Sequence, residues 1–186
     1  MVATTIVGTG GCGKSKPGFQ GIDITGADYA RDFRLPDANG VDRSLADFRG
    51  KYVLLFFGYA QCPDVCPTAL SRAVEVRRLL GPDGAKVQIV FVTVDPERDT
   101  PGVLREYLAA FDPSFIALRG TVEQTAKTAR EFKAFYQKVP TGSSYAMDHS
   151  ALTYVFDTSG KVRLAMRHAD TAQQIADDLR QLMSAS

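Results

Sequence analysis

Residues 52–70 read YVLLFFGYAQCPDVCPTAL, an apolar run followed at once by two cysteines. The first eight residues are continuously apolar, which is typical of a strand buried on both faces of a sheet. After the cysteines, apolar residues recur at close to helical spacing until Gly81-Pro82 supplies a stop. The stretch therefore predicts a buried strand that leads directly into a helix.

The same alternation continues along the chain. VQIVFVTVD, at 87–95, predicts a second buried strand, and Thr100 before Pro101 is placed to cap the next helix. A short strand is expected before residue 121. The pairs Thr121/Gln124 and Thr171/Gln174 have capping-box spacing and predict two further helices. ALTYVFD and KVRLAMR, joined by Thr158-Ser159-Gly160, predict an antiparallel hairpin between those two helices.

This order predicts an α/β domain with a thioredoxin-like fold, in which a central mixed sheet is flanked by helices. Asn39-Gly40, between the short apolar segments of residues 33–47, predicts an N-terminal β-hairpin extension. Residues 96–120 are interpreted as an insertion into the fold.

Composition favours one domain. The chain has 186 residues, of which 45% are hydrophobic, and a net charge of +1 with no long run of either sign, so we expect no nucleic-acid binding. No apolar stretch approaches the roughly 18 residues needed to cross a bilayer. Residues 1–28 are rich in glycine, threonine and serine without periodicity and predict a flexible tail or tether. The folded domain is then expected over residues 29–186.

GTGGCGKS, at 8–15, matches the pattern of a phosphate-binding loop. Such a loop needs a buried strand before it and a helix after it. Here Pro17 and Gly18 disfavour the helix, so the match is interpreted as accidental and no nucleotide is expected.

Cys62 and Cys66 stand four residues apart at the predicted junction of strand and helix. If the first turn is helical, both sulfur atoms project from one face. The amides and dipole of a helix N-terminus favour the thiolate, so the pair predicts either a redox-active disulfide or a site for a soft metal. Copper(I) is the metal that softness favours, with zinc as its competitor. A structural disulfide remains an alternative.

His149 is the candidate third ligand. It is expected in a loop just before a strand, and in a thioredoxin-like sheet that loop faces the start of the cysteine-bearing helix. His168 is interpreted as structural. Asp64 is expected to stabilise the helix dipole, with a role as an oxygen ligand or in tuning thiol ionisation as the alternative. Met147 is expected to pack, and Asp148 is a candidate for orienting the imidazole or for a hydrogen bond to a neighbour. Asp95, Arg98 and Asp99 are candidates for orienting the site or for contacting a partner; a solvated loop with a salt bridge and a helix cap is the alternative.

CPDVCP, VTVDPERDTP and MDHS, in this order, resemble the Sco/SenC family of copper-binding assembly factors for cytochrome c oxidase over about residues 30–184. The resemblance implies that Cys62, Cys66 and His149 bind copper, as Cu(I) and in some states Cu(II). It also implies the copper-binding subunit of cytochrome c oxidase as partner, with a thioredoxin-like reductant or another copper chaperone as further candidates.

Family members usually carry a transmembrane or lipid anchor, which implies the periplasmic side of the bacterial inner membrane. Small residues before Cys12 partly resemble a lipoprotein cleavage site, so Cys12 is the candidate for a lipid anchor; a free thiol there is the alternative.

The expected function is that of a copper metallochaperone that delivers copper to the oxidase or helps its copper centre to mature. The alternatives use the same cysteines. One is a thiol-disulfide reductase that reduces the cysteines of the oxidase copper site through Cys62 and Cys66, and another is a redox sensor. A peroxidase would need one indispensable cysteine rather than two.

Overall fold

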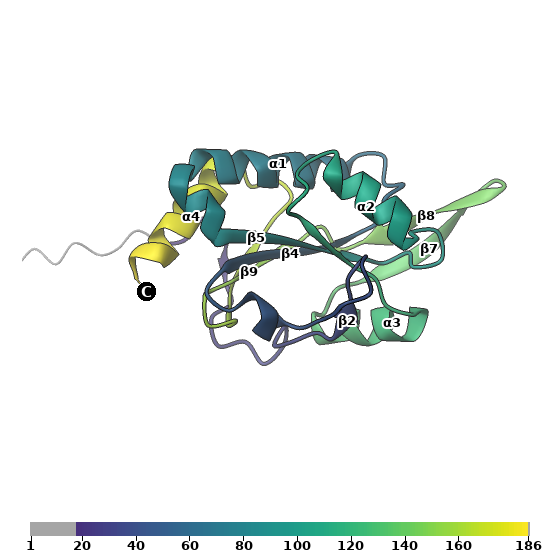
Figure 1. The fold of residues 1–186 in the computed structure, drawn as a ribbon, viewed down its shortest axis with the longest axis horizontal. Helices are drawn as coiled ribbons and strands as arrows, with labels where there is room; N and C mark the ends of the chain where they lie inside the picture. The colour runs from purple at the N-terminus through teal and green to yellow at the C-terminus, as the bar shows by residue number, and fades with distance from the viewer. Residues whose placement is uncertain (1–17, 186) are drawn as a thin grey trace, which may run out of the picture.

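A six-stranded mixed sheet forms the centre of the computed structural model, which describes residues 18–185 (Figure 1). Its strands, in the order in which they lie across the sheet, are β1 (Ile22–Asp23), β10 (Val162–Met166), β9 (Thr153–Phe156), β4 (Tyr52–Gly58), β5 (Val87–Thr93) and β6 (Ile116–Leu118). The pairs β4–β5 and β5–β6 are parallel, whereas β9 and β10 are antiparallel to their neighbours. Every residue of β4 is buried, as its apolar run predicts.

Helices cover both faces of this sheet (Figure 1). On one face lie α1 (Val65–Leu79), α2 (Pro101–Ala109) and α4 (Ala172–Ser184), and on the other lies α3 (Val122–Glu131). The apolar side chains accordingly form two clusters, one on each side of the sheet. The thioredoxin-like fold predicted from the sequence is confirmed.

Three helix starts follow the predicted capping. Thr100, Thr121 and Thr171 are the N-caps of α2, α3 and α4, and the last two form complete capping boxes with Gln124 and Gln174. Each box satisfies amide groups that the first helical turn would otherwise leave without partners.

The predicted N-terminal hairpin is present as β2 (Leu35–Pro36) and β3 (Asp42–Arg43), with the turn at Gly40, whose φ is +81°. The region 96–120, expected as an insertion, contains α2 and β6.

A second hairpin was not predicted. Residues before His149 were expected to form a loop, but they form β7 (Tyr136–Thr141) and β8 (Ser144–His149), which pair antiparallel around Gly142. Among the described strands, β7 and β8 pair only with each other, and the hairpin projects from the body of the domain (Figure 1). His149 is therefore the last residue of a strand rather than part of a loop.

The packed part of the chain begins before Tyr29. β1 pairs with β10, and the Asp178 carboxylate, 2% exposed, accepts hydrogen bonds from the backbone N–H groups of Gln20 and Gly21. Part of the region expected as a tail is thus attached to the domain, and the rest lies outside the described residues.

Cys12 and the GTGGCGKS stretch also lie outside the described residues. In residues 18–185, the helices are all too short or too polar to span a bilayer.

Candidate metal centre

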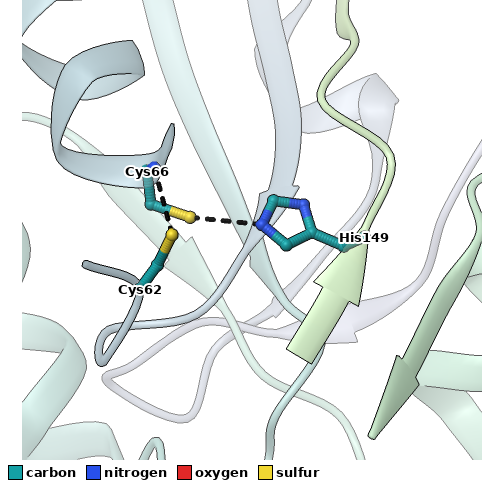
Figure 2. Close-up of side chains that lie close together, drawn as sticks. All are labelled: Cys62, Cys66 and His149. Carbon is teal, nitrogen blue, oxygen red and sulfur yellow. Dashed lines mark hydrogen bonds between the residues drawn. The ribbon is translucent and has the colours of Figure 1, made fainter. Parts of the chain in front are cut away.

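The two cysteines lie where β4 gives way to α1. Cys62 is in the turn before the helix and Cys66 is in its first turn, so only the second cysteine is helical. The backbone N–H of Cys66 donates to Cys62 Sγ at 3.4 Å (Figure 2). The expectation that both sulfur atoms project from one helix face is therefore wrong. Instead, the N-terminus of α1 faces the sulfur of Cys62. This position favours a thiolate for the reason already predicted.

Cys66 is fully buried, and Gly58 at the end of β4 makes room for its sulfur. A Cβ atom added at Gly58 would lie 2.6 Å from Cys66 Sγ and 2.8 Å from Cε2 of Phe91. Real Cβ atoms do not approach other atoms so closely, so a glycine is required here by packing. The sequence gives no local sign of this contact.

His149 brings the third donor from the end of β8. Its Nε2 atom lies 3.5 Å from Cys66 Sγ, as Figure 2 shows. Its Nδ1 atom lies 3.0 Å from the carbonyl oxygen of Ser150, which can only accept. Nδ1 therefore carries the proton, and the Nε2 lone pair is directed toward the sulfur atoms. The ring also packs edge-on against Tyr59, with centroids 5.9 Å apart.

Neighbouring residues have different roles from those of the ligands. Asp148 is exposed, and the carbonyl of Ser150, rather than the Asp148 carboxylate, orients the imidazole. Met147 is 5% exposed and packs in the core, as expected. Asp64 occupies the N-cap position of α1, with its carboxylate 3.4 Å from the Thr68 hydroxyl.

The Sγ atoms of Cys62 and Cys66 and a ring nitrogen of His149 all lie within 4.8 Å of one another. Neither cysteine forms a disulfide, and Cys62 and His149 are partly exposed. Two thiolates and one imidazole form a soft, low-coordinate donor set that suits copper(I). No second Cys or His pair joins them among the described residues, so the arrangement lacks the four ligands of a structural zinc site.

The two thiols differ in acidity. A hydrogen bond from the Cys66 thiol is the main cause that lowers the pKa of Cys62 to about 4, and it outweighs partial burial. The backbone N–H groups of Asp64 and Cys66 also lower it. The same hydrogen bond, together with burial, raises the pKa of Cys66. The pair thus combines a partly exposed cysteine whose pKa is lowered with a buried cysteine whose pKa is raised.

Fold and site together define a thioredoxin-like protein with a Cys-x-x-x-Cys pair and a distal histidine. The model of the SCO1/SenC family matches residues 23–184, and the chain belongs to this family. The mitochondrial SCO2 homolog of Bos taurus is 40% identical over 158 residues, which cover 83% of this chain and 59% of the bovine protein. The chain therefore matches less than two thirds of that relative's length.

Solved structures agree with this assignment. Bradyrhizobium japonicum ScoI with copper bound has 41% sequence identity and a TM-score of 0.74, over 81% of this chain and 97% of that one. BsSco is described as a member of the Sco family of cytochrome c oxidase assembly proteins and as containing a disulfide switch. It has 23% identity and a TM-score of 0.70, over 90% of this chain and all of that one, a similarity that supports the fold.

Proposed function

We propose that the protein is a copper metallochaperone, which carries copper as cargo on Cys62, Cys66 and His149 and delivers it to, or helps to mature, the copper centre of cytochrome c oxidase. The observation that carries the proposal is the convergence of three soft donors within 4.8 Å from two distant parts of the chain. The copper-bound ScoI structure supports the choice of metal, and the description of the Sco family supports the destination.

The exposure of the site suits transfer rather than storage. Cys66 is buried, but Cys62 and His149 reach solvent. An incoming thiolate can therefore approach a three-coordinate copper(I) ion and replace one ligand at a time. This stepwise exchange avoids releasing the metal into water.

Copper(I) binding to the anaerobically reduced protein tests this proposal. A chromogenic chelator competes for the metal with the wild type, with His149→Ala and with His168→Ala as the matched control. We expect one tightly bound equivalent, weakened about tenfold (about 1.4 kcal/mol) or more by His149→Ala and unchanged in the control. Weak binding by the wild type would refute the copper site, and full affinity in His149→Ala would remove that residue from it.

The thiol pair supports a second candidate, a thiol-disulfide reductase acting on the cysteines of the oxidase copper site. A partly exposed thiolate beside a buried thiol is the arrangement that exchange chemistry requires, because the first attacks a disulfide and the second resolves the intermediate. This activity needs both cysteines but not His149. Reductase turnover that survives in His149→Ala, together with oxidase assembly that also survives, would favour it. The same pair would serve a redox sensor.

We place the protein on the periplasmic side of the bacterial inner membrane, with Cys12 as the candidate lipid anchor. The partner in this proposal is the copper-binding subunit of the oxidase, with a thioredoxin-like reductant or another copper chaperone upstream. Intact-mass analysis of the membrane fraction tests the anchor, since an acylated Cys12 adds the mass of its lipid and Cys12→Ala abolishes that addition.

A further inference from the structure

The loop between β5 and α2 supplies no ligand, yet it contacts both halves of the candidate metal centre. Asp95 and Asp99 in this loop are 1% and 0% exposed. Burial of two carboxylates is costly unless each has hydrogen-bond partners. The hydrogen-bond partners of Asp99 lie on the cysteine side of the site, and those of Asp95 lie on the histidine side.

Asp99 holds the cysteine side. Its carboxylate accepts a hydrogen bond from the Thr93 hydroxyl at 2.5 Å and one from the backbone N–H of Ala60 at 3.1 Å. Ala60 lies two residues before Cys62, in the turn that leaves β4. The carboxylate thus ties the start of the cysteine turn to the end of β5.

Asp95 and Arg98 hold the histidine side. They form a salt bridge in which the Asp95 side chain is fully buried. Arg98 Nη1 donates to the backbone carbonyl of Tyr145 at 2.8 Å, and its guanidinium carbon lies 3.7 Å from the centre of the Tyr145 ring. The Tyr145 hydroxyl in turn donates to Asp95 at 2.9 Å. The Asp95–Arg98 salt bridge therefore contacts Tyr145 of β8 at its backbone carbonyl, its ring and its hydroxyl.

Tyr145 is a suitable point from which to fix His149. The two residues are four positions apart in one strand, so their side chains project from the same face. The β7–β8 hairpin pairs with no other described strand, so side-chain contacts must fix its orientation relative to the central sheet. Arg98 also lies 5.8 Å from the centre of the Tyr59 ring, which packs on His149.

We propose that Asp95, Arg98 and Asp99 are positioning residues for the metal centre: Asp99 fixes the cysteine turn, the Asp95–Arg98 pair fixes the hairpin, and one loop thereby sets the distance between the cysteines and His149. The proposal deepens the proposed function and rests on it where copper binding is the measurement.

The first test compares copper(I) affinity in the presence and absence of His149. Asp95→Asn combined with Arg98→Met removes both charges, so that no carboxylate stays buried alone. For this double variant we expect copper(I) affinity to fall about tenfold when His149 is present. In the His149→Ala background we expect the affinity to change by less than about twofold. Asp99→Asn is expected to weaken binding several-fold in both backgrounds, because it acts on the cysteine turn. Equal losses in both backgrounds for the double variant would overturn the proposal.

The matched control is Asp112→Asn combined with Arg77→Met. This pair is also a partly buried salt bridge, with side chains 28% and 24% exposed, but Arg77 lies eleven residues beyond Cys66 on α1. That spacing places it about 16 Å away along the helix. Its removal is expected to leave copper affinity unchanged in both backgrounds.

A second measurement needs no copper. Amide hydrogen exchange of the metal-free protein is expected to become about tenfold or more faster over residues 136–149 in the Asp95→Asn, Arg98→Met variant, with β4 and β5 unchanged. Unchanged hydrogen exchange in the hairpin would overturn the positioning proposal, whether or not the wild type binds copper. Failure of the wild type to bind copper would refute the proposed function, and the exchange measurement would still test the positioning role. If the double variant does not fold, Tyr145→Phe removes only the hydroxyl bonded to Asp95, and a smaller change in the same direction is expected from it.

Discussion

The Sγ atom of Cys66 and the Nε2 atom of His149 lie 3.5 Å apart, although the two residues are 83 positions apart in the sequence. Cys66 belongs to the buried core beside β4, whereas His149 is carried by a hairpin outside the six-stranded sheet. The candidate site is thus assembled from a part that the fold determines and a part that side-chain contacts determine. The two parts should respond differently to substitution.

Gly58→Ala tests the part that the fold determines. The new Cβ would overlap Cys66 Sγ and the Phe91 ring, so we expect the free energy of unfolding to fall by about 1–3 kcal/mol and copper(I) affinity to fall with it. Urea unfolding and chelator competition measure the two effects. Gly102→Ala is the control, since its nearest neighbour is 3.9 Å away in a helix, where alanine is preferred by up to about 1 kcal/mol. Equal stability of the two variants would contradict the packing argument.

Cys62 should be the reactive thiol. Because the pKa of Cys62 is lowered to about 4, its thiolate is present from neutral pH down to that value and is lost by protonation below it. Alkylation by iodoacetamide, followed by mass spectrometry, is expected to modify Cys62 first and to slow only near pH 4. Cys66→Ala removes the main donor and is expected to move the midpoint upward. A midpoint that does not move would show that this hydrogen bond is not the cause.

The same hydrogen bond affects stability with a definite sign. Because the pKa of Cys62 is lowered in the folded state, its ionisation contributes fully to the free energy of unfolding above the ordinary cysteine pKa. This stabilisation is lost progressively as the pH falls toward 4. The stability of the wild type should therefore fall more than that of Cys66→Ala over this range. Parallel denaturation curves for the two proteins would contradict this assignment.

A chain that starts at Tyr29 should be less stable than one that starts at Gly18. It lacks β1 and leaves the buried Asp178 carboxylate without the amides of Gln20 and Gly21. We expect a loss of about 2–4 kcal/mol in urea unfolding, since an unpaired buried acceptor adds its desolvation cost to the lost hydrogen bonds. Equal midpoints would support the boundary at residue 29 that composition predicts.

Removal of copper should leave the fold intact. Among the candidate ligands, only Cys66 belongs to the buried residues of the apolar clusters on the two faces of the sheet, and Cys62 packs against one cluster as a partly buried residue. After loading with copper(I) and stripping with a chelator, the far-ultraviolet circular dichroism is expected to be unchanged. Loading itself should raise the melting temperature of the wild type, and should raise it less in His149→Ala, because tighter binding to the folded state stabilises it more. Loss of helical signal on stripping would indicate a structural metal instead.

The buried strands and capped helices were predictable because their signals are local. A continuous apolar run at 52–59 and capping residues such as Thr121 and Thr171 act within a few positions, and the structure places them as expected. The β7–β8 hairpin was missed because YQKVPT and SYAMDH have little apolar alternation, and Pro140 disfavours a strand. β7 is mostly exposed and Met147 is the only buried residue of β8, so burial left too weak an apolar pattern to be read from the sequence.

The candidate ligands were also predictable, from residue types and motif order, but the residues that hold them were not. Gly58 resembles any glycine at the end of a strand until the position of Cys66 Sγ is known. Tyr145 has no motif of its own, and its link to Arg98 joins residues 47 positions apart. Contacts of this kind depend on how elements pack, which no short stretch of sequence encodes.

If the protein carries copper as proposed, the isolation of the β7–β8 hairpin bears on how the ion can leave. Since its backbone ladder joins no other described strand, a displacement of the hairpin from the cysteines would break no hydrogen bond of the central sheet, but it would break the Arg98–Tyr145 contacts and expose Met147. An acceptor would then meet an ion held by two sulfur atoms on a rigid support, with its third coordination position vacated at the expense of side-chain contacts alone. The cost of opening the site would then be that of the contacts between the hairpin and the rest of the domain, and the central sheet would keep its hydrogen bonds.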